Sequence, residues 1–441
     1  MFYIHCNSYR KYNDVSVGGK SDLRQSIRPF RGDSMNHPIK LASIPNEEYS
    51  EYRYNVIFKA YKWDPQVGDH NTIAKHVVLM DQETVRQLET WAEQLSAETM
   101  LMEEAFLQKP ELANQLGLPR KILKELKRLS SYDRSQNVRL MRFDFHPTTE
   151  GWAVSEVNSD VPGGLAEASV LPKIACSFFN GYEPRKHVGE SILQAFSQRI
   201  RQDGIIALVH ATSYSDDRQV MEFLSDCIKA HGYNTVFAAP DHIVWKDNKG
   251  ICIIEGKEGP IDGIIRFFPL EWFINLPRRS NWKGYFDCLT TSCNHPVAIF
   301  TQSKRLPLVW DKLGVDVSTW KKLLPETRDP KSVKPQDNDW IYKPALGRVG
   351  EDISIKGAIP EKELLKIEKA ARRNSGDWVA QRKFTSKPLT DEKGETFHLC
   401  VGVFTVNGKS AGFYGRISPY PRIDDRAKDI PLLVSKGGNN E

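Results

Sequence analysis

The chain has 441 residues, a length that predicts about three domains of roughly 150 residues each. It carries 61 lysines and arginines against 56 aspartates and glutamates, and this net charge of +5 is too small for the basic stripe of a dedicated nucleic-acid-binding protein. Ordinary numbers of glycine (29) and proline (25) exclude collagen-like and low-complexity chains, so we expect a soluble globular protein.

The cysteines and the apolar residues indicate the cellular compartment of the protein. Seven cysteines are scattered along the chain with no C-x-x-C spacing, which favours free thiols in a reducing compartment. The first ten residues lack the pattern of a signal peptide, and no apolar run reaches the ~18 residues of a membrane span. We therefore expect a cytoplasmic protein with no membrane or nucleic-acid partner.

The first part of the chain divides into an arm and a helical segment. Residues 1–60 are polar with little periodicity, and we expect an irregular N-terminal arm there. Asp81 is a good helix cap, and a second helix is predicted over residues 119–129. The first of these helices has apolar residues at three- and four-residue steps: Val85, Leu88, Ala92, Leu95, Met102 and Phe106.

Strands dominate the rest of the chain. Apolar and polar residues alternate at 138–145 and again at 152–158, and turn residues separate the two segments. This pattern predicts a β-hairpin. The last third reads as strands around one helix at 360–374, which fits an α+β layer. Between them, apolar runs alternate with polar or helical stretches and predict an open α/β sheet; the runs lie at 205–211, 234–240, 262–268 and 296–300.

Polar residues two apart mark one face of the predicted hairpin. Arg142 and Asp144 share a face of the first strand, and Glu156 and Asn158 share a face of the second. If the strands pair, the oxygen donors converge in a set that suits Mg²⁺. A solvated strand face explains the pattern equally well. The loop at 159–164 follows directly and is placed to bring backbone donors near an anion.

A second cluster follows the strand that ends in Lys343. Gly347 and Gly350 lie three residues apart around Arg348, and glycines let backbone N–H groups approach phosphates closely. An ordinary glycine-rich turn is the more frequent explanation of such a loop.

Taken in order, five stretches resemble the synthetase part of the glutathionylspermidine synthase family. They are RFDF at 142–145, SEVNSDVPGG at 155–164, SKRLPLVW at 303–310, KPALGRVGED at 343–352 and YGR at 414–416. The resemblance implies an ATP-grasp fold preceded by an α/β sheet, and an ATP-dependent carboxylate–amine ligase. After the arm at 1–60, we therefore expect three parts: a helical segment with the metal hairpin at 61–200, the pre-ATP-grasp domain at 201–302 and the nucleotide-binding region at 303–441.

The resemblance also implies roles for individual residues and two substrates, a small-molecule or peptide carboxylate and an amine. Arg142 would neutralise the acceptor carboxylate and Arg416 the acyl phosphate formed from it. The Mg²⁺ that bridges the ATP phosphates would be held by Asp144, Glu156 and Asn158. Contacts with ATP would come from Lys304, Lys343, Gly347, Arg348, Gly350 and, at the adenine, Gln381.

Departures and alternatives stay open at this point. The phosphate loop has Val349 where the family has glutamate, and the turn at 159–163 differs from the family's pattern near the acceptor. An ATP-dependent kinase and a non-catalytic ATP-binding module are the competing functions, and Arg416 has an alternative role in pairing with Asp424 or Asp425. Nothing in the sequence names the acid, the amine or the oligomeric state.

Overall fold

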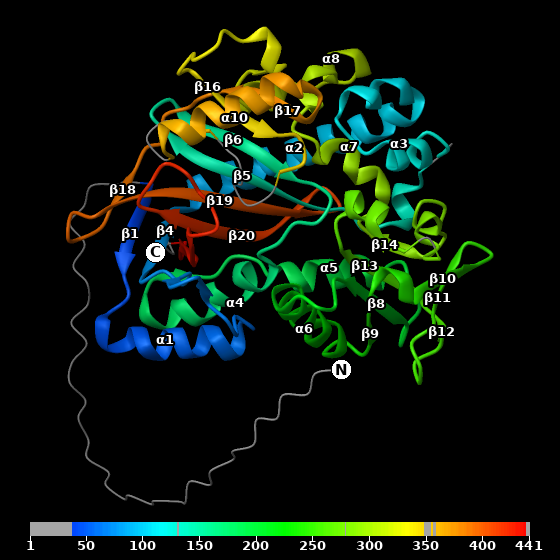
Figure 1. Cartoon of the computed structure of the whole chain (residues 1–441). Helices are drawn as coiled ribbons and strands as arrows, with labels where there is room; N and C mark the ends of the chain where they lie inside the picture. The colour runs from blue at the N-terminus through cyan, green and yellow to red at the C-terminus, as the bar shows by residue number, and fades with distance from the viewer. Residues whose placement is uncertain (1–37, 130–131, 278, 348–353, 356–358, 438–441) are drawn as a thin grey trace, which may run out of the picture. The chain divides into compact units, whose positions relative to one another are not determined.

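An antiparallel sheet of six strands lies in the middle of the computed structural model (Figure 1), which describes residues 38–129, 132–277, 279–347, 354–355 and 359–437. Its strands pair in the order β21–β20–β19–β5–β6, with β18 added on β19. The predicted hairpin is confirmed as the pair β5–β6. The strand bounds are β5 Leu140–Thr148, β6 Gly151–Asn158, β18 Leu389–Thr390, β19 Thr396–Val406, β20 Lys409–Ser418 and β21 Lys428–Ile430.

The register of the β5–β6 hairpin gathers its polar residues. Asp144 lies opposite Glu156, and Arg142 lies opposite Asn158. A register shift follows Asp144, as in a β-bulge that re-aims the next side chains. Phe143, between the two polar residues of β5, is fully buried. The alternation therefore separates a polar face from a face that joins the core.

Helix α2 (Gln82–Gln108) packs against β19 and β20. It begins where the sequence predicts, because the Asp81 side chain accepts a hydrogen bond from the Thr84 backbone N–H at 2.7 Å. The second predicted helix is confirmed as α3 (Arg120–Leu126). All the apolar positions predicted for the first helix are fully buried: Val85, Leu88, Ala92, Leu95, Met102 and Phe106.

The predicted open α/β sheet is present as four parallel strands in the order β14–β13–β8–β9. The expected strand at 296–300 is wrong: a 3₁₀ turn begins at Pro296 and continues into α7 (Ile299–Gln302). Proline suits the first helical position, and so short an apolar run does not distinguish helix from strand. The elements are β8 Ile205–His210, α6 Ser215–Lys229, β9 Asn234–Ala238, β13 Gly263–Phe267 and β14 Thr291–Cys293.

A smaller sheet carries the residues near Lys343. Its strands are β15 (Thr327–Arg328), β17 (Trp378–Arg382) and β16 (Trp340–Pro344), in that order, and α10 (Glu361–Arg373) packs on β16. This arrangement confirms the strand–helix–strand order predicted for this region. Several further elements lie outside this sheet. They are β2 Gln66–Val67, β3 His70–Asn71, α5 Val188–Ser197, β10 Ile243–Lys246, β11 Lys249–Cys252, β12 Gly259–Pro260, α8 Trp310–Leu313 and α9 Ser318–Leu323.

The N-terminal expectation is wrong for residues 39–59, which form a strand and a helix; residues 1–37 lie outside the described part of the chain. Tyr52 and Val56 of the helix are fully buried although most of their neighbours are polar, so tertiary packing holds a segment with weak periodicity. The strand joins a sheet of order β1–β4–β22–β7, and α4 packs on α1. The bounds are β1 Ile39–Ser43, α1 Asn46–Lys59, β4 His76–Met80, α4 Leu165–Ala175, β7 Tyr182–Glu183 and β22 Leu432–Ser435.

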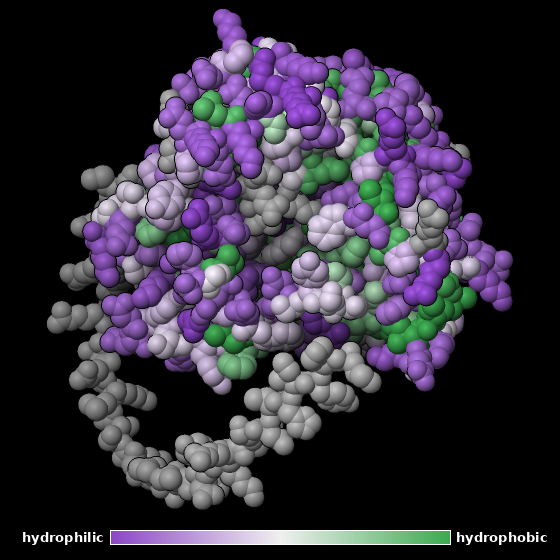
Figure 2. Space-filling model, in the orientation of Figure 1, coloured by the Kyte–Doolittle hydropathy of each residue, from purple (hydrophilic) through white to green (hydrophobic). Residues whose placement is uncertain are grey.

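The chain from Pro38 onward forms one compact unit, and the internal boundaries predicted at 201 and 303 stay predictions. Hydrophilic side chains cover most of the face seen in Figure 2, with apolar residues in small patches. Among the described helices, none combines the length and apolarity needed to cross a bilayer. The parallel α/β sheet together with antiparallel layers confirms the predicted fold class.

Candidate active site

A cavity of about 620 Å³ opens beside the polar face of the β5–β6 hairpin. Its wall is built by β5, β6, β16 and β20 and by the first turns of α4 and α6. The structure therefore brings together residues that are far apart in the sequence. Six of the predicted site residues line this cavity: Arg142, Asp144, Glu156, Asn158, Lys343 and Arg416.

Asp144 is the centre of a hydrogen-bonded group on the hairpin. The guanidinium of Arg142 donates to both of its carboxylate oxygens, at 2.7 and 2.9 Å, and the Asn158 amide donates at 3.0 Å. Burial opposes the charge on Arg142, but the Asp144 carboxylate outweighs it and raises the pKa of Arg142. The guanidinium also lies 5.0 Å from the ring centre of Tyr414, so packing fixes its orientation.

Glu156 pairs with Lys304 and is also influenced by the charge of Lys343. Lys304 Nζ is 3.0 Å from the Glu156 carboxylate and donates to the Gly347 carbonyl at 2.7 Å. Burial tends to raise the pKa of Glu156, but Lys304 and Lys343 together lower it. Burial and the charge of Lys304 lower the pKa of Lys343 to about 8, against the opposing effect of Glu156. The carboxylate is thus held ionised among cations.

Lys343 is also tied to Gln381, whose side-chain oxygen accepts its hydrogen bond at 2.7 Å. The Gln381 amide donates in turn to Thr327 at 3.2 Å. Gln381 is buried behind Lys343 rather than on the cavity wall. In the predicted phosphate loop, Arg348, Val349 and Gly350 lie outside the described residues.

Arg416 reaches the cavity from β20. Its guanidinium donates hydrogen bonds to the backbone carbonyls of Asp424 and Ala427. Arg416 therefore does not form the alternative ion pair with the Asp424 or Asp425 carboxylate. The Asp424 carboxylate pairs instead with Arg426 at 3.0 Å. Nε of Arg416 is buried and has no partner among the described residues. A buried, unused guanidinium donor favours an anionic ligand.

The turn after β6 divides between the core and the cavity. Ser159 and Asp160 are almost completely buried away from the site, whereas Gly163 and Gly164 line it. The Gly163 carbonyl accepts a hydrogen bond from Arg142 at 2.7 Å, and the expectation that this loop brings backbone donors near an anion stays a prediction. Gly164 has a φ of +84°, and a Cβ there would lie 2.9 Å from the Tyr414 ring, so only glycine fits.

A cluster of charges that the sequence did not predict closes another part of the wall. Lys62 Nζ lies 2.7 Å from Glu167 and 2.8 Å from Asp429, and the Tyr414 hydroxyl donates to Asp429 at 2.7 Å. Burial opposes the charge on Asp429, but Lys62 and Arg416 lower its pKa. No local motif signals this cluster, because it joins residues 62, 167 and 429.

His146 is a further unpredicted residue on the wall. Its Nε2 lies 3.0 Å from the Ser155 hydroxyl, and burial lowers the pKa of His146 to about 4. The imidazole is therefore neutral at pH 7 and adds no charge beside Lys343.

The residues present fit a magnesium ion. Asp144, Glu156 and Asn158 offer carboxylate and amide oxygens from one hairpin, on which Asp144 lies opposite Glu156. Among the described residues, no three of His, Cys, Asp or Glu come together as a metal-binding group, so the candidate set has only two carboxylates and one amide. Mg²⁺ needs few protein ligands, because it keeps waters and substrate phosphate oxygens.

The sequence of the chain was also compared with models of known protein families. The model of the family described as glutathionylspermidine synthase preATP-grasp matches residues 46–435. A search of curated protein sequences gave no significant match.

Among solved structures, a glutathione synthetase-like effector from Globodera pallida, in its apo form, is similar at 10% identity with a TM-score of 0.57, covering 82% of this chain and 90% of that one. That likeness shows the fold. A putative gamma-glutamylcysteine synthetase from Methylobacillus flagellatus matches at 11% identity with a TM-score of 0.38, over 75% of this chain and 87% of that one.

Proposed function

The chain belongs to the glutathionylspermidine synthase preATP-grasp family, and from this premise we propose that it is an ATP-dependent ligase joining a carboxylate to an amine through an acyl phosphate. The substrates are a small-molecule or peptide acid and an amine. The observation that carries the proposal is the meeting of two arginines, two carboxylates and a buried lysine in one cavity: Arg142, Arg416, Asp144, Glu156 and Lys343.

In this proposal, the β5–β6 hairpin provides the metal site of the cavity. Asp144, Glu156 and Asn158 hold Mg²⁺, which neutralises phosphate charge when bound. Their facing register and the oxygen-rich donor set support the assignment.

The nucleotide lies against the smaller sheet. Lys304 and Lys343 bind its phosphates with the loop of Gly347, and Arg348 and Gly350 are proposed to complete that loop. Gln381 acts at this end through Lys343, to which it is hydrogen-bonded.

Arg142 and Arg416 act on the acid. A carboxylate is a poor electrophile, and phosphorylation turns it into an acyl phosphate that an amine attacks. The protein must position groups and stabilise developing negative charge, for which two largely buried guanidiniums are suited. The unused Nε of Arg416 supports its place at the anion.

A substrate panel with Mg-ATP tests the proposal. ADP and phosphate should appear only when both an acid and an amine are supplied, with an amide as product. ADP formed together with a stable phosphorylated product would indicate a kinase. Binding of ATP without turnover across the panel would indicate a non-catalytic module.

Removing the charge of Lys343 should weaken ATP binding. Lys343→Met loses a charge-assisted phosphate contact worth about 1.5–3 kcal/mol, or roughly 10- to 150-fold in dissociation constant by calorimetry. Because its pKa is lowered to about 8, Lys343 is charged at pH 7 and neutral at pH 9. The wild-type affinity for ATP should therefore fall over this range, and the variant should lose most of that pH dependence.

The matched control is Lys362→Met, on the exposed side of α10 in the same region. It should bind ATP like the wild type at every pH. Equal affinities for Lys343→Met and Lys362→Met would contradict the nucleotide site.

A further inference from the structure

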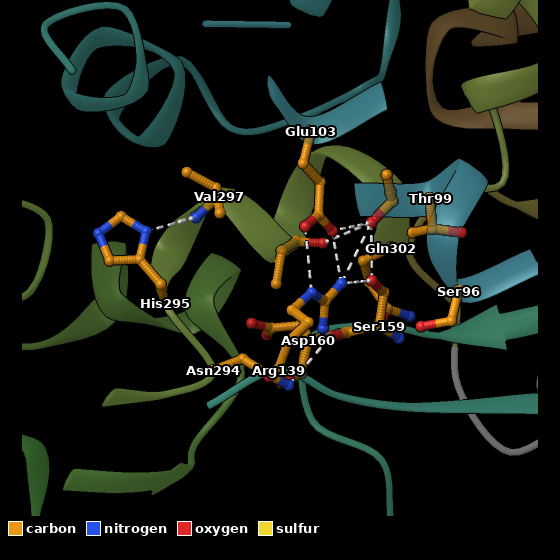
Figure 3. A network of polar contacts seen from close by, with 12 residues as sticks. Ser96, Thr99, Glu103, Arg139, Ser159, Asp160, Asn294, His295, Val297 and Gln302 are labelled. Atoms are coloured by element: carbon orange, nitrogen blue, oxygen red, sulfur yellow. Dashed lines mark hydrogen bonds and ion pairs between the residues drawn. The ribbon is translucent and has the colours of Figure 1, made fainter. Parts of the chain in front are cut away.

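A buried polar network surrounds Ser159, in the turn after β6 (Figure 3), and its residues Glu103, Arg139 and Thr301 do not line the cavity. Arg139 and Glu103 are 1% and 0% exposed, and the Arg139 guanidinium donates to both carboxylate oxygens of Glu103. The same guanidinium donates to the Ser159 carbonyl at 2.6 Å and contacts the Ser159 hydroxyl. The Thr301 hydroxyl joins both groups: it donates to Glu103 at 2.7 Å and lies 2.7 Å from the Ser159 hydroxyl.

The network fixes the turn after β6 from several sides. The side-chain oxygen of Gln302 accepts from the backbone N–H groups of Ser159 and Asp160, both at 2.8 Å. The Asn294 amide donates to the carbonyls of the same two residues, at 3.1 and 3.0 Å. Arg266 pairs with the Asp160 carboxylate, which also accepts the Leu270 N–H at 2.9 Å. Both residues of the turn are thus held through backbone and side chain, more than is needed to close a loop.

The two ends of this network lead to the candidate site. Ser159 directly follows Asn158, whose amide is bonded to Asp144. Gln302 stands two residues before Lys304, which pairs with Glu156 at 3.0 Å. The link from Ser159 through Thr301 and Gln302 therefore sets the distance between the polar strand and the lysine that faces it.

We propose that Glu103, Arg139, Ser159, Thr301 and Gln302 form a positioning network that fixes Asn158 and Lys304 relative to each other, and so tunes the affinity for Mg-ATP. This inference rests on the proposed function. Residues that orient metal ligands from behind alter metal affinity or activity by about 10- to 100-fold when they are changed. Displacements of about 1 Å at a reacting group have effects of about 100-fold.

Thr301→Val tests the network with a small change, because valine keeps the shape and removes only the hydroxyl. We expect about a 10-fold higher Mg²⁺ concentration for half-maximal ATP binding, measured by calorimetry, and a similar rise in the Mg²⁺ needed for ADP formation. Thr301→Ser restores the hydroxyl and should return both values to within about twofold of the wild type.

The matched control is Thr405→Val. Thr405 is also fully buried, and its hydroxyl also reaches α2, where it donates to Ser96 at 3.3 Å, but it does not touch the turn. The Mg²⁺ dependence of Thr405→Val should equal that of the wild type. If Thr301→Val does not fold, Ser159→Ala removes the partner hydroxyl and should give the same rise.

The outcomes separate the two proposals. A wild-type protein that binds ATP with Mg²⁺, together with equal Mg²⁺ dependence in Thr301→Val (or Ser159→Ala) and Thr405→Val, would overturn the positioning role and leave the proposed function intact. Failure of the wild type itself to bind ATP in the presence of Mg²⁺ would overturn both.

Discussion

Replacing Glu156 with glutamine is expected to lower ADP formation by about 100- to 1,000-fold at saturating Mg-ATP, and Asp144→Asn should have an effect of similar size. Each change keeps the shape of the side chain and removes one negative charge from the proposed magnesium set. Glu156 is also the counter-charge of Lys304, at 3.0 Å. Its loss therefore weakens the metal site and releases a lysine assigned to the nucleotide.

The two substitutions differ in their cost to folding. Asp144 accepts two hydrogen bonds from the largely buried guanidinium of Arg142, and an unpaired buried charge costs about 3–5 kcal/mol. Glu156→Gln leaves Lys304 bonded to the Gly347 carbonyl, so its unfolding midpoint should change less. Glu150→Gln, exposed at the tip of the same hairpin, is the control and should keep full activity. A near-normal rate in Glu156→Gln would refute the metal assignment.

The hairpin could be predicted from the sequence because its information is local. Strand alternation alone decides that Arg142 and Asp144 share a face, and the short connection to Glu156 and Asn158 leaves antiparallel pairing as the simple solution. In the structure the two strands pair antiparallel, and Asp144 lies opposite Glu156. Helix α2 was predictable for the same reason, since its cap and apolar stripe lie within one segment.

The rest of the site depends on contacts that no local pattern encodes. Lys62 meets Asp429 across almost the whole chain, and neither residue has a periodicity that reveals the partner. The direction of the Ser159 side chain could not be predicted, because a turn has no alternation to fix it; in the structure, Arg139 and Thr301 bond Ser159 in the core. The irregular arm was mispredicted over residues 39–59 since strand β1 is defined by its pairing with β4.

Arg416→Ala should suppress formation of the acyl phosphate far more than it weakens ATP binding. The intermediate can be measured with acid, Mg-ATP and hydroxylamine, which attacks the acyl carbon, displaces phosphate and leaves a hydroxamate. Loss of one charged donor from the developing anion should lower the trapping rate by about 100- to 1,000-fold. The dissociation constant for ATP should stay within about threefold of the wild type, because the proposed nucleotide contacts come from Lys304 and Lys343.

The alternative explanation of such a loss is that Arg416 only holds the loop containing Asp424 and Ala427. Arg426→Ala separates the two roles, since Arg426 holds the same loop through the Asp424 carboxylate but does not line the cavity. If the guanidinium acts on the anion, Arg426→Ala should trap hydroxamate within about twofold of the wild type. Arg416→Lys should recover part of the rate, because lysine restores the charge but not the forked donors. Equal losses in Arg416→Ala and Arg426→Ala would assign Arg416 to the loop, and the carboxylate would then have Arg142 as its remaining proposed partner.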